Sequence, residues 1–229
     1  MGANGFEGAA PLLDLILLGP VGAGKGTQAR RIVTKYGIPH IASGDLLRAH
    51  RSRDTELGRL AKDYMDRGAL VPDDLVITMI IERMRQPDAN HGVLLDGFPR
   101  TLAQAQALDL ELQDEGRALT HALYLKVPYD VLIDRAAGRW TCRTCQATYN
   151  YRVRPPVKEG ICDLDGGELY QREDDRLDVV SERIKVYIAD TVPVVDYYRE
   201  RGILGEIDGT RDINTVASDI EAQLEAAVC

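Results

Sequence analysis

The first apolar segment of the chain ends in Gly19-Pro20-Val21-Gly22-Ala23-Gly24-Lys25-Gly26-Thr27, and a helical pattern follows directly. Glycines let backbone N–H groups approach the oxygens of a polyphosphate, and the N-terminus of the following helix adds positive potential. Lys25 has the reach and the charge to contact the transferable phosphate. This strand-to-helix setting predicts a phosphate-binding loop (P-loop) rather than a glycine-rich turn that only caps a helix.

A second motif supplies a carboxylate. In the general P-loop motif a hydroxyl residue follows the lysine and binds Mg²⁺, whereas here Gly26 follows it and Thr27 comes one residue later. The apolar run 92–96 ends in Asp96, and open α/β sheets bind their ligands at the carboxyl ends of strands. We interpret Asp96 as a group that orients Mg²⁺ or its water molecules, the alternative being a turn or helix-capping residue.

Around these motifs, short apolar runs alternate with longer amphipathic stretches. This pattern is typical of an α/β fold, a doubly wound parallel sheet with helices on both faces. The expected strands cover residues 12–18, 38–42, 92–96, 121–127 and 203–207. The expected helices cover residues 25–36, 73–85, 102–115, 129–137, 176–201 and 213–227, and Pro193 should bend the helix in which it lies. We therefore expect a five-stranded core.

Two interruptions break this rhythm. Residues 43–71 form a charged, helical insertion, and residues 138–175 read as a small β-rich lobe containing three of the four cysteines. The core is then built from residues 12–42, 72–137 and 176–229, and residues 1–11 are expected to be a flexible tail.

Composition excludes several classes of protein. The chain has 229 residues, of which 45% are hydrophobic and 28% charged, so it is neither a disulfide-stapled scaffold nor a disordered protein. Its net charge of −8 argues against general binding to nucleic acid or to anionic membranes. No apolar run approaches the roughly 20 residues of a membrane span, and residues 1–11 lack a signal-peptide pattern. We expect a cytoplasmic protein whose anionic ligands need a local basic pocket.

The cysteines predict a metal site. Cys142-x-x-Cys145 is followed, after sixteen intervening residues, by Cys162-x-x-Asp165. Two chelating pairs at this spacing fit a tetrahedral structural Zn²⁺ that would brace a lobe too small for its own core. The alternative is a set of free thiols in a hydrogen-bonded lobe, and Cys229 belongs to neither.

Four motifs together resemble adenylate kinase, in its bacterial form with a long, zinc-binding lid. They are Gly22-Ala23-Gly24-Lys25-Gly26-Thr27, Ser43-Gly44-Asp45-Leu46-Leu47-Arg48, Asp96-Gly97-Phe98-Pro99-Arg100-Thr101 and Arg172-Glu173-Asp174-Asp175-Arg176. The resemblance implies a nucleoside-monophosphate-binding insertion at residues 43–71 and a lid at residues 138–175. It implies a monomer that transfers a phosphoryl group reversibly from Mg-ATP to AMP, giving two ADP, in adenine nucleotide homeostasis. The chain departs from the family at Pro20-Val21, where proline often occupies the second position.

The resemblance also implies roles for individual residues. Charges that stabilise the transferring group would come from Lys25, Arg100, Arg139, Arg172 and Arg183. ATP would contact Gly22, Ala23, Gly24, Lys25, Gly26, Thr27, Arg139, Thr148, Tyr149 and Arg211. AMP would contact Ser43, Arg48, Ala69, Leu70, Val71, Gly97, Phe98, Pro99, Arg100, Gln104, Arg172 and Arg183. Arg135 is a further candidate.

The chemistry explains why arginines dominate this set. The nucleophile is already an anionic phosphate oxygen, so charge neutralisation and alignment matter more than a general base, and we expect the four histidines to be structural. Gln104 follows Arg100 by four residues and can offer adenine both an acceptor and a donor. Solvated side chains are the alternative for Gln104 and for each lid arginine. Asp174 and Asp175 would orient Mg²⁺-bound water or serve only as a salt-bridged hinge.

Other functions remain open at this point. A different nucleoside monophosphate kinase or a GTP:AMP phosphotransferase would carry similar motifs. A regulatory P-loop switch is a candidate of another class, but it needs no second nucleotide pocket with its own arginines.

Overall fold

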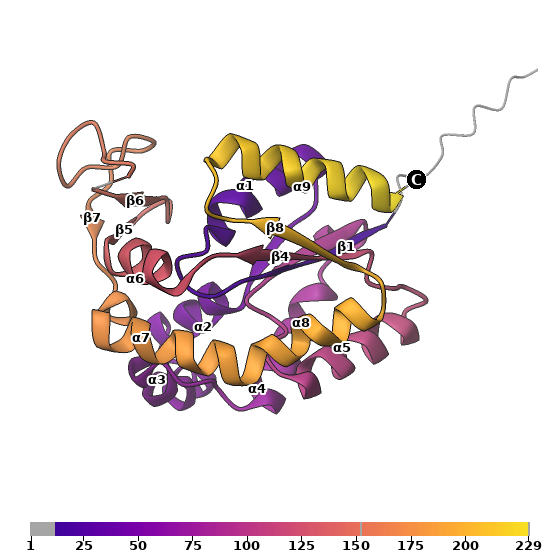
Figure 1. Ribbon diagram of the computed structural model, residues 1–229. Helices are drawn as coiled ribbons and strands as arrows, with labels where there is room; N and C mark the ends of the chain where they lie inside the picture. The colour runs from indigo at the N-terminus through magenta and orange to yellow at the C-terminus, as the bar shows by residue number, and fades with distance from the viewer. Residues whose placement is uncertain (1–11, 152, 229) are drawn as a thin grey trace, which may run out of the picture.

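Parallel strands form the centre of the molecule. Among residues 12–151 and 153–228, which the computed structural model describes, one five-stranded sheet has the order β2-β3-β1-β4-β8 (Figure 1). Its strands are β1 (Leu13–Leu18), β2 (His40–Ala42), β3 (Gly92–Asp96), β4 (His121–Lys126) and β8 (Leu204–Asp208). All neighbouring pairs in this sheet are parallel. The expected fold class is confirmed, while the expected tail at residues 1–11 and Cys229 lie outside the described residues.

The strand ends differ slightly from the expected ones. β2 begins at His40 rather than at residue 38 because Pro39 has no N–H for the ladder, although its carbonyl still accepts a hydrogen bond of 2.9 Å from the Leu94 amide. β8 begins and ends one residue later than expected.

Alternate side chains of the strands face opposite layers of helices. Leu13, Leu15 and Leu17 pack toward α1 (Lys25–Tyr36) and α9 (Ile213–Val228). Ile16 and Leu18 belong to the cluster on the other face, whose helices are α4 (Asp73–Met84), α5 (Leu102–Asp114) and α8 (Val192–Glu200). Figure 1 shows these two layers above and below the sheet. Because both faces are covered, ligands are expected at the strand ends.

The long helix expected over residues 176–201 is broken into three parts. They are α7 (Leu177–Val186), a π-helical segment (Tyr187–Thr191) and α8. Pro193 lies in the first turn of α8 and has no N–H to donate to the carbonyl of residue 189, so the preceding turn widens. The bend expected from Pro193 therefore takes the form of a π-helical turn.

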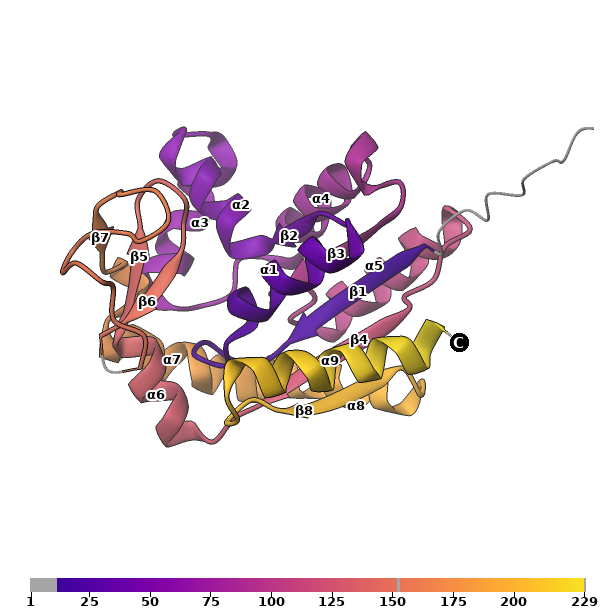
Figure 2. The same cartoon turned by 90° about the horizontal axis from the view of Figure 1, so that it is seen from above.

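The two interruptions form separate substructures at the same end of the sheet (Figure 2). Residues 43–71 contain α2 (Ser43–Ser52) and α3 (Glu56–Arg67), and the hydroxyl of Thr55 caps α3 by accepting a hydrogen bond from the Gly58 amide. Residues 138–175 contain a three-stranded antiparallel sheet of order β6-β5-β7. Its strands are β5 (Arg139–Cys142), β6 (Thr148–Asn150) and β7 (Leu169–Tyr170), and α6 (Tyr129–Ala137) leads into it.

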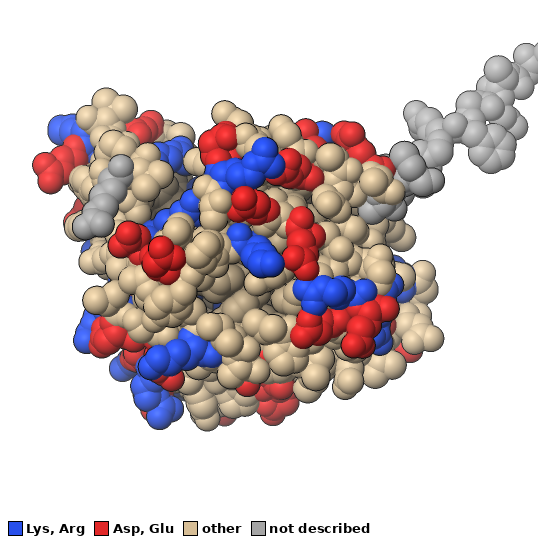
Figure 3. All heavy atoms as spheres, in the orientation of Figure 1, with Lys and Arg blue, Asp and Glu red and all other residues tan. Residues whose placement is uncertain are grey.

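The surface mixes charges of both signs. On the face drawn in Figure 3, acidic and basic side chains are interspersed over the core and the lid lobe. In the described part of the chain, every helix is too short or too polar to cross a membrane.

One buried ion pair joins the sheet to the end of α5. Asp14 on β1 is 1% exposed, and its carboxylate accepts hydrogen bonds from Arg117 Nε at 2.9 Å and Nη2 at 2.5 Å. Asp14 takes a polar side chain into an otherwise apolar strand, so its charge depends on this partner.

We expect Arg117→Met to lower the free energy of unfolding by about 3–5 kcal/mol, because it leaves the Asp14 carboxylate buried without a counter-charge. Urea unfolding measures the change. Arg85→Met is the matched control, because the exposed Arg85–Glu111 pair should contribute about 1 kcal/mol or less. Equal losses in the two variants would contradict the prediction.

Candidate active site

The loop between β1 and α1 has the backbone of a phosphate cradle. Gly22 and Gly24 have φ values of 86° and 95°, in the region that favours glycine. A Cβ atom on Gly22 would lie 2.5 Å from the carbonyl oxygen of Leu132 on α6. The P-loop residues expected to bind ATP, from Gly22 to Thr27, all line one large cavity.

Lys25, the first residue of α1, turns its side chain back along the loop. Its Nζ donates hydrogen bonds to the carbonyl oxygens of Gly19 at 2.7 Å and Pro20 at 3.2 Å. Burial lowers the pKa of Lys25 to about 8, and the nearby Asp96 carboxylate only partly opposes this. The hydrogen bonds of this ammonium go to neutral carbonyl oxygens, so an anionic ligand would stabilise it further.

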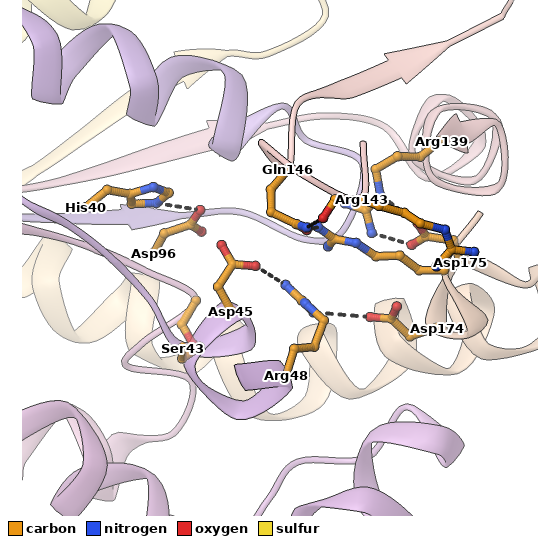
Figure 4. A network of polar contacts seen from close by, with 12 residues as sticks. His40, Ser43, Asp45, Arg48, Asp96, Arg139, Arg143, Gln146, Asp174 and Asp175 are labelled. Atoms are coloured by element: carbon orange, nitrogen blue, oxygen red, sulfur yellow. Dashed lines mark hydrogen bonds and ion pairs between the residues drawn. The ribbon is translucent and has the colours of Figure 1, made fainter. Parts of the chain in front are cut away.

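Asp96 lies at the carboxyl end of β3 beside a histidine that the sequence did not single out. His40 Nε2 is 3.3 Å from Asp96 Oδ2 (Figure 4). Burial would raise the pKa of Asp96, but the hydrogen bond from His40 and the charge of Lys25 outweigh it, and the pKa lies below its usual value. Asp96 is therefore a carboxylate facing the cavity of the P-loop.

The large cavity, of about 810 Å³, collects positive charge from several elements. Its arginines come from α1, the insertion, the loop after β3, α6, the lid lobe and the loop after β8: Arg30, Arg48, Arg100, Arg135, Arg139, Arg154, Arg172 and Arg211. The local basic pocket expected in an acidic protein is thus present.

Carboxylates at the end of the lid lobe pair with the expected arginines (Figure 4). Arg139 Nε donates to the fully buried carboxylate of Asp175 at 2.8 Å. Arg183 Nη1 donates to Asp174 Oδ2 at 2.9 Å, and Arg48 Nη1 lies 3.7 Å from the same oxygen. Burial lowers the pKa of Arg183 to about 10, so it keeps its charge at neutral pH. In this structure Asp174 and Asp175 form ion pairs at the end of the lid lobe.

Arg172 has few polar partners for a buried arginine. It is 9% exposed, and its Nη2 donates to Gln146 Oε1 at 3.3 Å. Its buried Nε has no hydrogen-bond partner among the described residues.

A second, smaller pocket of about 60 Å³ lies between the insertion and α5. The residues expected at the acceptor site that line it are Ser43, Ala69, Leu70, Val71, Gly97, Arg100, Gln104 and Arg183. Gln104 is 2% exposed, so it is not a solvated helix residue. Arg48 lines the large cavity instead, and the ring of Phe98 is fully buried in the core.

Between these two spaces lies a third, of about 40 Å³, where the charged groups meet. Lys25, Pro99, Arg100 and Arg183 line it together. Arg100 and Gly97 line all three spaces, and Arg100 Nε donates to the Gly97 carbonyl at 2.8 Å.

The weaker ATP-contact candidates also line the large cavity, each with a partner of its own. Thr148 Oγ1 accepts a hydrogen bond of 3.3 Å from Arg30. Arg211 pairs with Asp219 at 2.7 Å. The hydroxyl of Tyr149 is buried in the lid lobe, where it accepts a hydrogen bond of 2.8 Å from the Asp163 amide.

The metal-ligand candidates lie together in the lid lobe. One ligand atom from each of Cys142, Cys145, Cys162 and Asp165 falls within 4.8 Å of all the others. Cys145 Sγ and Cys162 Sγ are 3.6 Å apart, and Cys142 Sγ is 3.3 Å from Asp165 Oδ1. Tetrahedral Zn²⁺ with ligand bonds of about 2.0–2.3 Å requires separations of about 3.5–3.8 Å. One of the two separations lies in this range and the other falls short of it by about 0.2 Å, so small adjustments of the four side chains would accommodate such an ion.

Sequence reasoning missed several residues at the large cavity. They are His40, Arg30 and Arg154. His40 lies beside Asp96 because β2 pairs with β3. The order of strands in a sheet cannot be predicted from a single sequence. Arg30, in the second turn of α1, reaches the lid lobe through its hydrogen bond to Thr148 Oγ1 at 3.3 Å, and no local motif marks that position.

These features define a class. A P-loop that shares its cavity with converging arginines, next to a separate pocket built by an insertion, characterises a P-loop phosphotransferase that holds two nucleotides. A family model of adenylate kinase matches residues 17–203. The chain belongs to the adenylate kinase family.

Individual relatives agree. The adenylate kinase of Archaeoglobus fulgidus is 51% identical over 213 residues, covering 93% of this chain and 98% of that protein. That of Carboxydothermus hydrogenoformans is 51% identical over 213 residues, covering 93% and 100%. That of Lysinibacillus sphaericus is 50% identical over 215 residues, covering 94% and 99%. The expected activity, ATP + AMP to two ADP with Mg-ATP as donor, is confirmed, and the regulatory switch is not supported.

The lowered pKa of Lys25 predicts a pH dependence of ATP binding. Bound phosphate raises this pKa toward its usual value, so binding above pH 8 takes up a proton and ATP affinity should fall by up to about tenfold per pH unit. Calorimetric titration in buffers of different ionisation enthalpy measures the uptake. Lys25→Met should lose it, and Lys35→Met, which changes an exposed lysine of the same helix, should keep it. Equal proton uptake in wild type and Lys25→Met would contradict the prediction.

Proposed function

We propose that ATP occupies the large cavity and AMP the smaller pocket, with the phosphoryl group passing between them. The supporting observation is the third space, where Lys25, Arg100 and Arg183 face one another from the P-loop, the loop after β3 and α7. It adjoins both sites, since Arg100 and Gly97 line all three spaces. Three cations in one small volume suit a transferring phosphoryl group and suit no apolar ligand.

The reaction needs alignment more than proton transfer. The attacking oxygen of AMP is an ionised phosphate oxygen, so no side chain has to act as its base. Arg100 would hold the acceptor phosphate with its planar guanidinium, while Lys25 and the P-loop amides hold the donor phosphates. Arg139 and Arg172 would neutralise charge from the lid side as the group moves.

Mg²⁺ accompanies ATP in this family, and its charge screens the phosphate oxygens. Asp96 fits the ion because its pKa is lowered and its carboxylate faces the same cavity as Thr27. Asp96 would orient the water molecules of the ion, and His40 would hold Asp96 in place.

We also propose that residues 43–71 and 138–175 move against the core. About 60 Å³ is less than nucleotide pockets usually provide, so the acceptor pocket must widen when AMP enters. The contacts that would have to change join the insertion to the hinge: Arg51–Glu173 at 3.0 Å and Arg48–Asp174 at 3.7 Å. Both are ion pairs at least partly open to water, which rearrange at low cost. Closure of the lid would exclude water as a competing acceptor.

The lid cluster is proposed to hold a structural Zn²⁺. Four protein ligands leave no open position for a substrate. Neighbouring groups support the sulfur atoms: the amide of Thr144 donates to Cys142 Sγ at 3.3 Å, and that of Leu164 donates to Cys162 Sγ at 3.4 Å. The hydrogen bond from the Gly167 amide lowers the pKa of Asp165 to about 2, so this ligand is ionised.

Two further properties belong to the proposal. A monomer suffices, because every residue assigned to the two sites comes from one chain. A cytoplasmic location suits three unpaired cysteines arranged as metal ligands, since thiols stay reduced there.

Arg100→Ala should lower turnover at least a hundredfold, because removing one preorganised charge from a transferring phosphoryl group costs on the order of 3 kcal/mol. Coupled assays of ADP formation measure it. Arg83→Ala is the control, since Arg83 pairs with Asp88 on the surface of α4 and should leave turnover unchanged. A folded Arg100→Ala enzyme with near wild-type turnover would remove Arg100 from the proposed centre.

Removing the metal should loosen the lid and spare the core. We expect chelation or Cys142→Ser to abolish binding of one zinc ion per chain and to lower the melting temperature, while much of the activity remains at moderate temperature. Metal content and thermal unfolding are the measurements, and Cys229→Ser is the control. A purified protein without metal, whose melting ignores chelators, would refute the site.

A further inference from the structure

The side-chain amide of Gln104 is held from two sides. Its Nε2 donates to Asp73 Oδ1 at 2.7 Å, and its Oε1 accepts from the backbone amide of Arg100 at 2.8 Å. Gln104 lines the acceptor pocket, whereas Asp73 is outside the lining residues of that pocket in the described chain. Asp73 therefore reaches the pocket only through Gln104.

The carboxylate of Asp73 is itself fixed. Asp73 is the first residue of α4, and its Oδ2 accepts a hydrogen bond of 2.8 Å from Thr101 Oγ1. Thr101 is the N-cap of α5, and its Oγ1 accepts a hydrogen bond of 3.2 Å from the backbone N–H of Gln104. Asp73, Thr101 and Gln104 thus close a ring of hydrogen bonds between two helices.

This ring determines which way the Gln104 amide faces. A carboxylate only accepts hydrogen bonds and a backbone N–H only donates them. A reversed amide would set Oε1 against Asp73 Oδ1 and Nε2 against the Arg100 N–H, so that two partly buried pairs would repel. The orientation is therefore locked by the chemistry of its partners.

We propose that Asp73 makes the acceptor pocket specific for a 6-aminopurine base. The inference rests on the proposed function, in which Gln104 faces the base of the acceptor. Each partner uses one of the two N–H groups of Nε2 or one of the two lone pairs of Oε1. The remaining N–H and lone pair match adenine, whose edge presents an acceptor at N1 and a donor at N6.

A 6-oxopurine presents the reverse pattern. Hypoxanthine and guanine have an acceptor at O6 and a donor at N1, which only a reversed Gln104 amide would match. Because Asp73 prevents that reversal, both buried polar groups would be left unpaired, and such mismatches cost large factors in specificity. Asp73 is a positioning residue that selects the base without touching it.

The wild-type enzyme provides the first test. With ATP as donor, kcat/KM is measured for AMP, for purine riboside 5′-monophosphate, which lacks the 6-amino group, and for inosine 5′-monophosphate. A locked amide predicts this order of decreasing kcat/KM, with at least about a hundredfold between AMP and inosine 5′-monophosphate. An amide that turns freely would accept AMP and inosine 5′-monophosphate about equally, and that result would overturn the proposal.

Asp73→Asn is the second test. Asparagine has nearly the same shape but can donate as well as accept, so it removes the Asp73 constraint on the Gln104 amide and leaves only the Arg100 N–H to oppose reversal. We expect the ratio of kcat/KM for AMP over inosine 5′-monophosphate to fall at least about tenfold, mainly through a lower KM for the latter. Asp74→Asn, which removes the same charge from the exposed neighbour on α4, should keep the wild-type ratio.

The outcomes distinguish the role of Asp73 from the placement of the acceptor base at Gln104, on which it rests. If Asp73 only joined α4 to α5, Asp73→Asn would lower kcat/KM for both substrates by the same factor and leave the ratio unchanged, which overturns the lock. Gln104→Leu tests the underlying assignment: it should collapse the ratio. An unchanged ratio in Gln104→Leu would refute the placement of the acceptor base, whereas a collapsed ratio there with an unchanged one in Asp73→Asn would refute the lock alone.

Discussion

Positive charge buried in one hollow is the constraint on which the rest of this structure depends. The chain carries a net charge of −8, yet Lys25, Arg100 and Arg183 line a single small space. Burial lowers the pKa of each of these three groups, because the nearby carboxylates do not fully compensate for the loss of water. Carboxylates at the end of the lid lobe supply part of the missing charge, because Asp174 pairs with Arg183 and Asp175 with Arg139. The end of the lid lobe is thus ion-paired with arginines that, in the proposed function, neutralise the charge of the nucleotides.

The lid lobe has a small hydrophobic core. Its buried cluster has only Cys142, Ala147, Tyr149, Cys162 and Leu169, far fewer apolar groups than either face of the central sheet. A core this small gives little stability of its own, so cross-links by a metal would take over the work of packing. Tyr149 links the core of the lid lobe to the metal-ligand candidates and to the large cavity. Its ring is part of this cluster, its hydroxyl lies 3.4 Å from Cys162 Sγ, and the residue borders the large cavity.

Much of this architecture could be predicted from the sequence because its signals are local. The P-loop and the paired cysteines are contiguous patterns, and apolar periodicity marks the sheet and its helices. Contacts between distant segments could not be predicted. His40 meets Asp96 only through the order of the strands, and Asp73 meets Gln104 only where α4 approaches α5. The π-helical turn before Pro193 could not be predicted either, because a proline predicts a bend but not the backbone conformation that accommodates it.

The contact behind the P-loop gives the fold a mechanical property. Gly22 touches the backbone of Leu132 so closely that a single added carbon would lie 2.5 Å from the carbonyl oxygen, and Leu132 belongs to the helix that runs directly into the first lid strand. Densely packed backbone cannot be compressed. A shift of the loop would therefore press on α6, and α6 would carry it to the first lid strand, about a turn and a half further along the chain. Gly22, besides letting the loop approach phosphate, thus provides the contact between the P-loop and α6.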